Sequence, residues 1–234
     1  VVKNNSALST ALSKNIVEGP QERYQLDWQQ VNTMSKQGVT FANHGNEHIH
    51  SLQKQPAENQ SEWLARVVKN VTLAEQLLTD KVGYSLKYFA YPYGEYSQEY
   101  KQALVKLGYI GFAQHSGAMA SYSDFGALPR FPAAGIYGNL KTLKVKLNSL
   151  AMPAINLAPK DPAIGRDRDS LTFGFDITGN DVSPAQINCF KRGNKLSHEV
   201  DGKSILMEVQ GLTRAGRHRV NCTAPSKQHS GRYY

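Results

Sequence analysis

Helical and strand-like patterns alternate along residues 27–113, and this alternation limits the fold more than any other feature of the sequence. The patterns predict the following elements: helices at residues 28–37, 57–79 and 97–107, and strands at residues 39–42, 86–91 and 109–113. Asp27 and Ser97 are expected to cap the first and third of these helices. Strands that alternate with helices form a parallel sheet, so an α/β fold is expected.

Each predicted strand is followed by a loop that contains reactive or turn-forming residues. The three loops have the sequences NHGNEH, PYGEYS and QHSGAM. In parallel α/β sheets the active site lies at the carboxyl ends of the strands. The functional site is therefore expected where these loops begin.

The first loop contains two histidines, His44 and His48, four residues apart. Two imidazoles at this spacing can bind one metal ion, and imidazole suits zinc and similar divalent metals. A stable site needs a third ligand, usually a carboxylate or another histidine. Histidines also occur in turns and at helix caps, so the pair is informative mainly because it follows a predicted strand.

The string HGNEH also fits H-x-x-E-H, the inverted zinc-protease motif. That motif requires both histidines on one helix, with Glu47 as the general base. Gly45 and Asn46 are poor residues for a helix interior, and the preceding residues favour a strand. The protease is therefore the weaker alternative.

Several segments carry a resemblance to a known family. VTFANHGNEHIHSL resembles the second conserved motif of the polysaccharide deacetylases, carbohydrate esterase family 4, in which a His-xxx-His pair binds the metal. YFAYPYGEYS resembles the third motif of that family, a turn that forms one wall of the sugar groove. GYIGFAQHSG followed by ALPRFPAAG resembles the later strands of a bacterial subgroup that has a C-terminal β-domain. The resemblance covers about residues 26–150.

The resemblance implies roles for the residues that match the motifs. His44 and His48 would be metal ligands, and the expected cofactor is a divalent metal, zinc above all. The backbone N–H of Tyr93 would stabilise the oxyanion, and a donor of this kind is worth roughly 3 kcal/mol in the transition state. The substrate groove would be lined by other residues of the turn: Tyr91, Pro92 and Gly94.

The chain departs from the family pattern in three respects. Ala90 stands where the third motif often has Arg, and Arg130 is the candidate that would replace this charge. The final acid motif, Leu-x-His, is not recognisable, so His115 at a strand end is the candidate acid. Arg130 and His115 could instead have only structural roles in their loops. The first motif, an Asp-Asp pair that supplies the base and the third metal ligand, does not occur in the sequence and is expected upstream of residue 1.

The composition changes after the predicted deacetylase domain, residues 1–150. Residues 151–164 contain three prolines and are predicted to be a linker. Residues 165–234 contain short β-type segments separated by turns, which predicts a small antiparallel β-domain.

The charge pattern excludes one class of partner. The net charge is +8, but there is no run of Lys or Arg and no basic stripe interleaved with aromatic residues, so nucleic acid is not expected. No apolar run approaches the roughly 18 residues of a membrane span. The expected partner, implied by the resemblance, is an N-acetylated polysaccharide.

The motifs and the resemblance predict a partial, deformed (β/α) barrel of the polysaccharide deacetylase type, followed by a small antiparallel β-domain. The function that the resemblance implies is metal-dependent hydrolysis of N-acetyl groups on the amino sugars of a polysaccharide. A non-catalytic glycan-binding module of the same fold is the alternative. An Asp-Asp pair just upstream of residue 1 would favour the enzyme.

Cys189 and Cys222 both lie in predicted strands of the C-terminal region. A pair in one small β-domain favours a disulfide and an extracytoplasmic location, periplasmic or secreted, whereas two buried thiols in a cytosolic protein are the alternative. We expect thiol titration of the denatured, unreduced protein to find no free cysteine. Detection of two thiols would contradict the disulfide and remove the support for this location.

Overall fold

The computed structural model describes residues 26–165, 168–214 and 216–234. The chain divides into two units. The first consists of Val1–Ala113 and Phe125–Ala127, and the second of Gln114–Asp124 and Leu128–Tyr234. Separate clusters of buried hydrophobic side chains lie in the two units. The domain limits predicted at residues 150 and 165 stay predictions.

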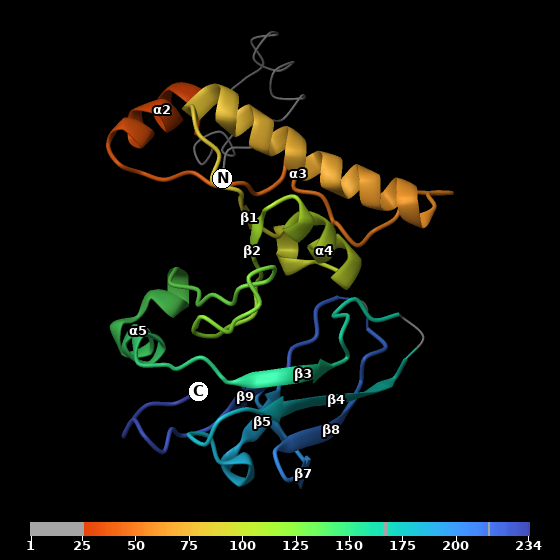
Figure 1. Cartoon of the computed structure of the whole chain (residues 1–234), viewed down its shortest axis with the longest axis vertical. Coiled ribbons are helices and arrows are strands. Elements are labelled where there is room, and N and C mark those ends of the chain that lie inside the picture. The colour runs from red at the N-terminus through yellow and green to blue at the C-terminus, as the bar shows by residue number, and fades with distance from the viewer. Residues whose placement is uncertain (1–25, 166–167, 215) are drawn as a thin grey trace. The chain divides into compact units, whose positions relative to one another are not determined.

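Helices and short strands alternate in the first unit (Figure 1). Its elements in chain order are α2 (Trp28–Lys36), α3 (Gln60–Val82), β1 (Tyr88–Ala90), the 3₁₀ helix η2 (Pro92–Gly94), α4 (Gln98–Lys106) and β2 (Ile110–Phe112). Asp27 caps α2 and Ser97 caps α4 through side-chain hydrogen bonds, as predicted. The long helix begins later than residue 57 because Asn59 is its N-cap, in a capping box with Glu62.

Parallel pairing brings three segments of the first unit together. β1 pairs with β2 in parallel register, with Phe89 opposite Gly111. Asn43 forms an isolated parallel bridge to Phe89. The chain therefore leaves Asn43 and β1 in the same direction, so the loops that follow them begin at the same edge.

The prediction of a strand at residues 39–42 is wrong, because the structure has only the bridge at Asn43 in this part of the chain. The N–H of Phe41 donates to the hydroxyl of Tyr84 at 2.8 Å and not to a neighbouring strand. The N–H of Phe41 thus has a side-chain acceptor in place of a strand partner, and backbone pairing in this segment is limited to the bridge at Asn43.

The core of the first unit lies against one face of α3. Trp63, Val67 and Val71 of this helix are buried. They belong to a cluster with aromatic and aliphatic side chains from β1, α4 and the adjoining segments: Phe89, Tyr91, Tyr100, Leu104 and Tyr109. Full burial of a large apolar side chain is worth about 1.5–3 kcal/mol, so this cluster fixes α3 against the sheet.

The second unit contains the remaining described elements. They are η3 (Gly135–Gly138), α5 (Leu140–Leu147), β3 (Ala154–Ala158), β4 (Ser170–Ile177), η4 (Pro184–Gln186), β5 (Asn188–Lys191), β6 (Asn194–Leu196), β7 (Glu199–Asp201), β8 (Ser204–Gln210) and β9 (Asn221–Thr223). Of the helices that the structure describes, none is both long and apolar enough to span a membrane.

The segment predicted to be a linker, residues 151–164, contains β3, which pairs antiparallel with β4. The side chains of Met152 and Ala154 pack on the hydrophobic core of the second unit. The prolines at the ends of this segment therefore border a strand, which is compatible with proline at strand ends.

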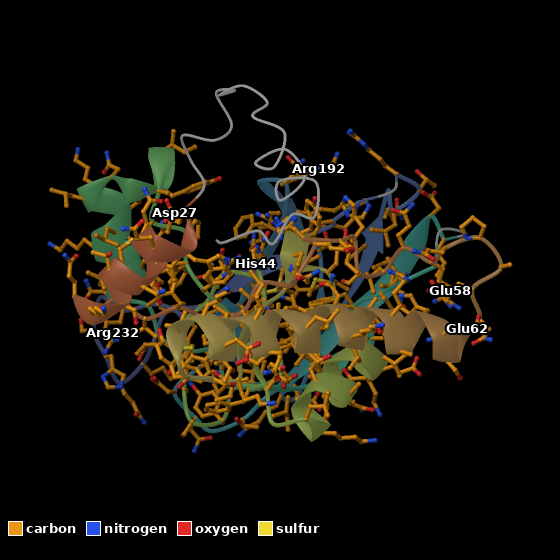
Figure 2. The ribbon with its side chains drawn as sticks, turned by 90° about the horizontal axis from the view of Figure 1, so that it is seen from above. Asp27, His44, Glu58, Glu62, Arg192 and Arg232 are labelled. Carbon is orange, nitrogen blue, oxygen red and sulfur yellow. A yellow bond between two sulfur atoms is a disulfide. The ribbon has the colours of Figure 1, made fainter. Side chains whose placement is uncertain are left out.

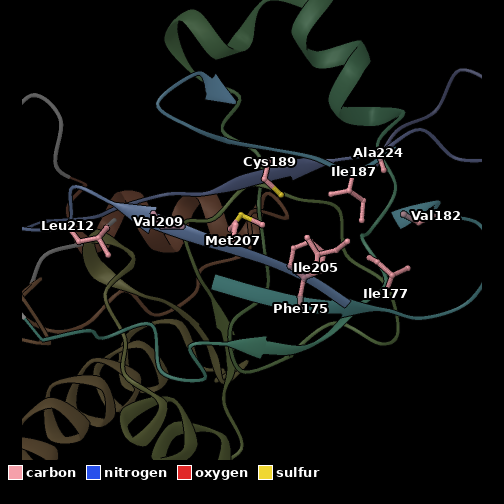
Figure 3. Packing of buried hydrophobic residues seen from close by; sticks show 10 residues of the cluster. All are labelled: Phe175, Ile177, Val182, Ile187, Cys189, Ile205, Met207, Val209, Leu212 and Ala224. Atoms are coloured by element: carbon pink, nitrogen blue, oxygen red, sulfur yellow. The ribbon is translucent and has the colours of Figure 1, made fainter. Parts of the chain in front are cut away.

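Two antiparallel sheets form in the described part of the second unit. Their strand orders are β3-β4-β8-β7 and β6-β5-β9. Ten buried residues make up the core: Phe175, Ile177, Val182, Ile187, Cys189, Ile205, Met207, Val209, Leu212 and Ala224 (Figure 3). Cys189 lies opposite Cys222 in the β5–β9 pairing, and a disulfide joins the two, as predicted.

Reduction of this disulfide should destabilise the second unit and leave the first unchanged. The bond links residues separated by 33 positions, and cross-links across loops of this length typically stabilise by about 3–4 kcal/mol. Both tryptophans, Trp28 and Trp63, belong to the first unit. We therefore expect reduction to lower the urea midpoint for hydrogen exchange in β8 without shifting the tryptophan fluorescence midpoint. Equal shifts of both midpoints would contradict the independence of the two units.

Candidate active site

The two predicted metal ligands lie on a loop that follows the Asn43 bridge. No helix forms in residues 44–50, and Gly45 and His48 have φ values of 83° and 50°. A helix requires φ near about −63°. The H-x-x-E-H protease, which needs both histidines on one helix, is therefore wrong for this chain.

His44 is anchored through one of its ring nitrogens. Its Nδ1 lies 2.6 Å from the carbonyl oxygen of Ala90 in β1. A carbonyl oxygen can only accept a hydrogen bond, so Nδ1 carries the proton and donates it. The lone pair of the neutral ring is then on Nε2, which is the tautomer that a metal-binding histidine uses when its other nitrogen is held by the protein.

The rings of His44, His48 and Tyr93 form a chain of edge-to-face contacts. The ring centroids of His44 and His48 are 4.7 Å apart, and those of His48 and Tyr93 are 4.6 Å apart. Tyr93 belongs to η2, the turn after β1. The structure thus brings the two histidines together beside this turn, as the motif spacing led us to expect, whereas metal binding stays a prediction.

Tyr93 combines a strained backbone with an exposed ring. Its φ is +56°, and a non-glycine residue in this region costs about 1–3 kcal/mol. The residue is 41% exposed. His50 stacks on the ring with a centroid distance of 3.9 Å and an interplanar angle of 7°, and the Nδ1 of His50 lies 2.8 Å from a carboxylate oxygen of Glu95. The sequence analysis did not single out His50 or Glu95, although His50 lies only two residues after His48.

Tyr91 and Pro92, which were expected to line the substrate groove, are buried. The hydroxyl of Tyr91 donates to the carbonyl oxygen of Gly126 at 2.9 Å, and its ring contacts that of Phe89 at a centroid distance of 5.1 Å. Tyr91 is therefore a core residue, and its hydroxyl can be buried because it has a hydrogen-bond partner inside the protein. Gly94 closes the turn with a φ of 72°, and its contact with substrate stays a prediction.

A buried polar network lies behind the histidine loop. Asn43 is 2% exposed and Glu75 of α3 is 6% exposed. The side-chain amide of Asn43 donates to a carboxylate oxygen of Glu75 at 2.7 Å and to the carbonyl oxygen of Val71 at 2.9 Å. Its oxygen accepts from the N–H of Gly45 at 2.8 Å. The sequence analysis missed this network, since Glu75 adjoins the apolar face of a helix and gives no local sign of burial.

Asn70 of α3 adds a second contact between the helix and the loop. The N–H of Asn46 lies 3.2 Å from the backbone oxygen of Asn70 and 3.1 Å from its side-chain oxygen. A Cβ atom on Gly45 would lie only 2.7 Å from that side-chain oxygen. Glycine is therefore required at position 45 both by its positive φ and by this close approach. In Figure 2, His44 is labelled next to the long helix α3.

A cavity of about 290 Å³ adjoins the loop. His44 and Gly45 contribute to one side, and apolar side chains that include Trp28, Phe41 and Leu77 form much of the rest. Apolar walls with a few polar groups are typical of small-molecule sites.

His115 and Arg130 belong to the second unit. They are linked by a hydrogen bond from the N–H of Arg130 to the carbonyl oxygen of His115 at 3.0 Å. Desolvation, followed by repulsion from Arg219 and Arg130, lowers the pKa of the Arg217 guanidinium. Arg130 thus lies near a basic cluster of the second unit, and the catalytic roles expected for His115 and Arg130 stay predictions.

The third metal ligand is not found in the part of the chain that the structure describes. Within that part, no group of three or more His, Cys, Asp or Glu side chains could hold a metal ion. The Asp-Asp motif expected to supply a ligand and the base does not occur in the sequence, and its place upstream of residue 1 stays a prediction. His44 and His48 therefore fit a metal site as two imidazole ligands, and a complete site would need at least one more ligand.

Residues 6–112 match the family described as polysaccharide deacetylase. This part of the chain is therefore similar to the polysaccharide deacetylase family. The match includes the histidine loop, α3, β1, the η2 turn and β2, which are the elements that build the site. It stops before His115 and Arg130, so the roles of these two residues have no support from the family match.

Three solved deacetylase structures are similar to parts of this chain. The BpsB deacetylase domain from Bordetella bronchiseptica is 23% identical with a TM-score of 0.42, covering 49% of this chain and 51% of that one. The deacetylase PplD from Streptococcus pyogenes, in complex with acetate, is 20% identical with a TM-score of 0.40, covering 45% and 44%. A de-N-acetylase from Aggregatibacter actinomycetemcomitans is 16% identical with a TM-score of 0.45, covering 61% and 70%. The chain thus spans about half the length of the first two, and no curated protein sequence matches it.

The pKa of His115 provides a test of its surroundings. Desolvation lowers this pKa from its ordinary value of 6.5, and the charge of Asp124 partly opposes the change. Between the lowered pKa and 6.5 the unfolded chain binds more protons than the folded chain, so this group makes stability rise with pH across that window. We expect Asp124→Asn to lower the pKa of His115 further, measured by NMR titration of the ring, whereas Asp80→Asn should leave it unchanged. An unchanged or higher pKa in Asp124→Asn would show that the Asp124 charge does not raise the pKa of this ring.

Proposed function

We propose that this chain is part of a metal-dependent hydrolase that removes N-acetyl groups from the amino sugars of an N-acetylated polysaccharide. The observation that carries the proposal is the convergence of His44 and His48 beside Tyr93, within a segment that matches the polysaccharide deacetylase family. We further propose that the parallel pairing of Asn43, β1 and β2 is part of the deformed (β/α) barrel expected for this family.

An extracytoplasmic location, periplasmic or secreted, belongs to the same proposal. The disulfide between Cys189 and Cys222 supports it, because such bonds form and persist in oxidising compartments.

His44 and His48 are the residues that would hold the divalent metal, for which zinc is the proposed identity. The hydrogen bond from His44 Nδ1 to Ala90 supports this assignment, since it directs the Nε2 lone pair to a ligand role. When bound, the metal supplies Lewis-acid chemistry that polarises a carbonyl and activates water. We propose that an Asp-Asp motif outside the described residues supplies the third ligand and the general base.

The turn residue Tyr93 would contribute twice to the reaction. Its backbone N–H would donate to the oxygen of the acetamide as negative charge develops there. Its exposed ring, held on one face by His50, offers an apolar surface against which a sugar ring can pack. His115 as acid and Arg130 as a charged group remain predictions from the sequence.

A non-catalytic glycan-binding module is the second candidate. The absence of a three-residue metal group within the described residues favours it, and the exposed Tyr93 ring would serve binding as well as catalysis. The two candidates differ in whether acetate is released, so one assay distinguishes them.

We expect this chain to release little or no acetate from N-acetylated chito-oligosaccharides, even with added zinc or cobalt. The positioned carboxylate that transfers the proton is worth roughly 100-fold to 10,000-fold, and the sequence contains no Asp-Asp pair to supply it. A longer chain in which an Asp-Asp motif precedes residue 1 should release acetate. His44→Ala should abolish that release, and His229→Ala, an exposed histidine of the second unit, should not.

Robust, His44-dependent acetate release by the chain of 234 residues would contradict the placement of the base. Glycan binding without acetate release by the longer chain would favour the binding module. Release of acetate that does not depend on His44 would contradict the proposed metal ligands.

A further inference from the structure

We infer that Asn43 and Glu75 are positioning residues, which set the loop that carries His44 and His48 in its metal-binding arrangement. The inference rests on the proposed function, because it concerns how the same two histidines are held. Neither residue touches substrate or reacting atoms in the role inferred here. They act through a buried hydrogen-bond network between α3 and the loop.

Asn43 is fixed in both its backbone and its side chain. Its N–H donates to the carbonyl oxygen of Tyr88 at 3.0 Å, and its own carbonyl oxygen accepts from the N–H of Ala90 at 2.9 Å. Both hydrogens of its side-chain amide have acceptors, on Glu75 and Val71. The residue directly before His44 therefore has little freedom to rotate, and the path of the chain into His44 is set by the sheet and by α3 together.

The hydrogen bonds also determine which way the Asn43 amide points. Two acceptors, a carboxylate oxygen and a backbone carbonyl, lie on its nitrogen side, and the Gly45 N–H donates to its oxygen. The reversed amide would place its oxygen against both acceptors and its NH₂ against a donor. The orientation is thus unambiguous, and it is the one that holds Gly45 in place.

Glu75 is unusual because the core that surrounds it does not require a carboxylate. It lies on the helix that buries Val67, Val71 and Ala74, where an apolar side chain would pack well. Burial of a carboxylate is costly unless its oxygens are hydrogen-bonded. Glu75 meets that requirement by accepting from Asn43, from the Ser85 hydroxyl at 2.6 Å and from the N–H of Lys87 at 3.3 Å.

The cost of burying the Glu75 carboxylate is explained by the two segments of the chain that it holds together. One oxygen of Glu75 binds the start of the histidine loop, and the other binds the segment that leads into β1. β1 in turn supplies the Ala90 carbonyl oxygen that accepts from His44. Glu75 therefore links the two segments whose relative placement decides where the His44 ring lies.

The same network extends to the part of the loop that leads to His48. Gly45 is held by Asn43, and Asn46 is held by Asn70. His48 follows with a positive φ of 50°, a conformation that persists only when its surroundings determine it. Loss of the Asn43 contacts should therefore increase the mobility of both histidines. The inferred role of Glu75 does not require contact with either histidine ring.

Glu75→Met and Glu75→Gln separate this role from packing. Methionine keeps the volume and the burial but removes the acceptor for Asn43, whereas glutamine keeps an acceptor oxygen for it. Asp80→Ala is the matched control, because Asp80 is an exposed carboxylate on the same helix. The measurements are cobalt binding followed by absorption, and hydrogen exchange of the Gly45 amide relative to amides of Val67 and Leu104.

We expect Glu75→Met to weaken cobalt binding by roughly 10-fold to 100-fold, the usual effect of removing a group that orients a metal ligand. Exchange at Gly45 should accelerate while exchange at Val67 and Leu104 is retained. Glu75→Gln should retain most of the affinity, and Asp80→Ala should behave like the unaltered chain. If Glu75→Met fails to fold, the comparison of Asn43→Ala with Asp80→Ala provides the same test on the other partner.

His44→Ala separates failure of this inference from failure of the proposed function. If His44→Ala leaves cobalt binding unchanged, the metal site itself is wrong. If His44→Ala abolishes binding but Glu75→Met and Asn43→Ala change neither affinity nor Gly45 exchange, the positioning role is wrong. A uniform rise in exchange at Gly45, Val67 and Leu104 would also overturn the inference, because it would show that Glu75 only stabilises the fold.

Discussion

The parallel alignment of Asn43 with β1 is the constraint on which the candidate site depends. Two backbone hydrogen bonds hold this alignment, from Asn43 to Tyr88 and from Ala90 to Asn43. Because the two segments run in the same direction, the histidine loop and the η2 turn leave the sheet at one edge. The contacts of His48 with His44 and Tyr93 follow from that shared starting point. An antiparallel pairing of the same segments would send the loop and the turn to opposite ends.

Helix α3 has two separate tasks on adjoining faces. Its apolar face, with Val67 and Val71, packs against the aromatic core and stabilises the first unit. Its polar buried groups, Asn70 and Glu75, contact the histidine loop. Apolar packing is tolerant of substitutions that conserve volume, whereas buried hydrogen bonds depend on the partner atoms. Stability and site geometry therefore rest on different residues of one helix.

Local signals in the sequence were sufficient for the helices and for the pairing of His44 with His48, but not for the buried contacts around them. Asp27 and Ser97 could be predicted as caps because capping involves only the next few residues. Glu75 could not, since its partner Asn43 lies 32 positions away and a charged residue beside an apolar stripe is normally exposed. Tyr91 was placed in the groove because it lies in the turn that resembles the groove wall of the family, but its hydroxyl bonds to Gly126, 35 positions away. The errors thus occurred where a long-range hydrogen bond decides the environment of the side chain.

Two residues of the candidate site have strained backbone conformations. His48 and Tyr93 both have positive φ values although neither is glycine, and each such residue costs about 1–3 kcal/mol. Glycine at either position would relieve that cost, but it would remove the ring that contacts its neighbour. The contacts between these rings and the stack of His50 on Tyr93 can exist only with the strained residues present. Part of the stability gained by the core around α3 is therefore offset at this edge of the sheet, where side-chain placement takes precedence over backbone preference.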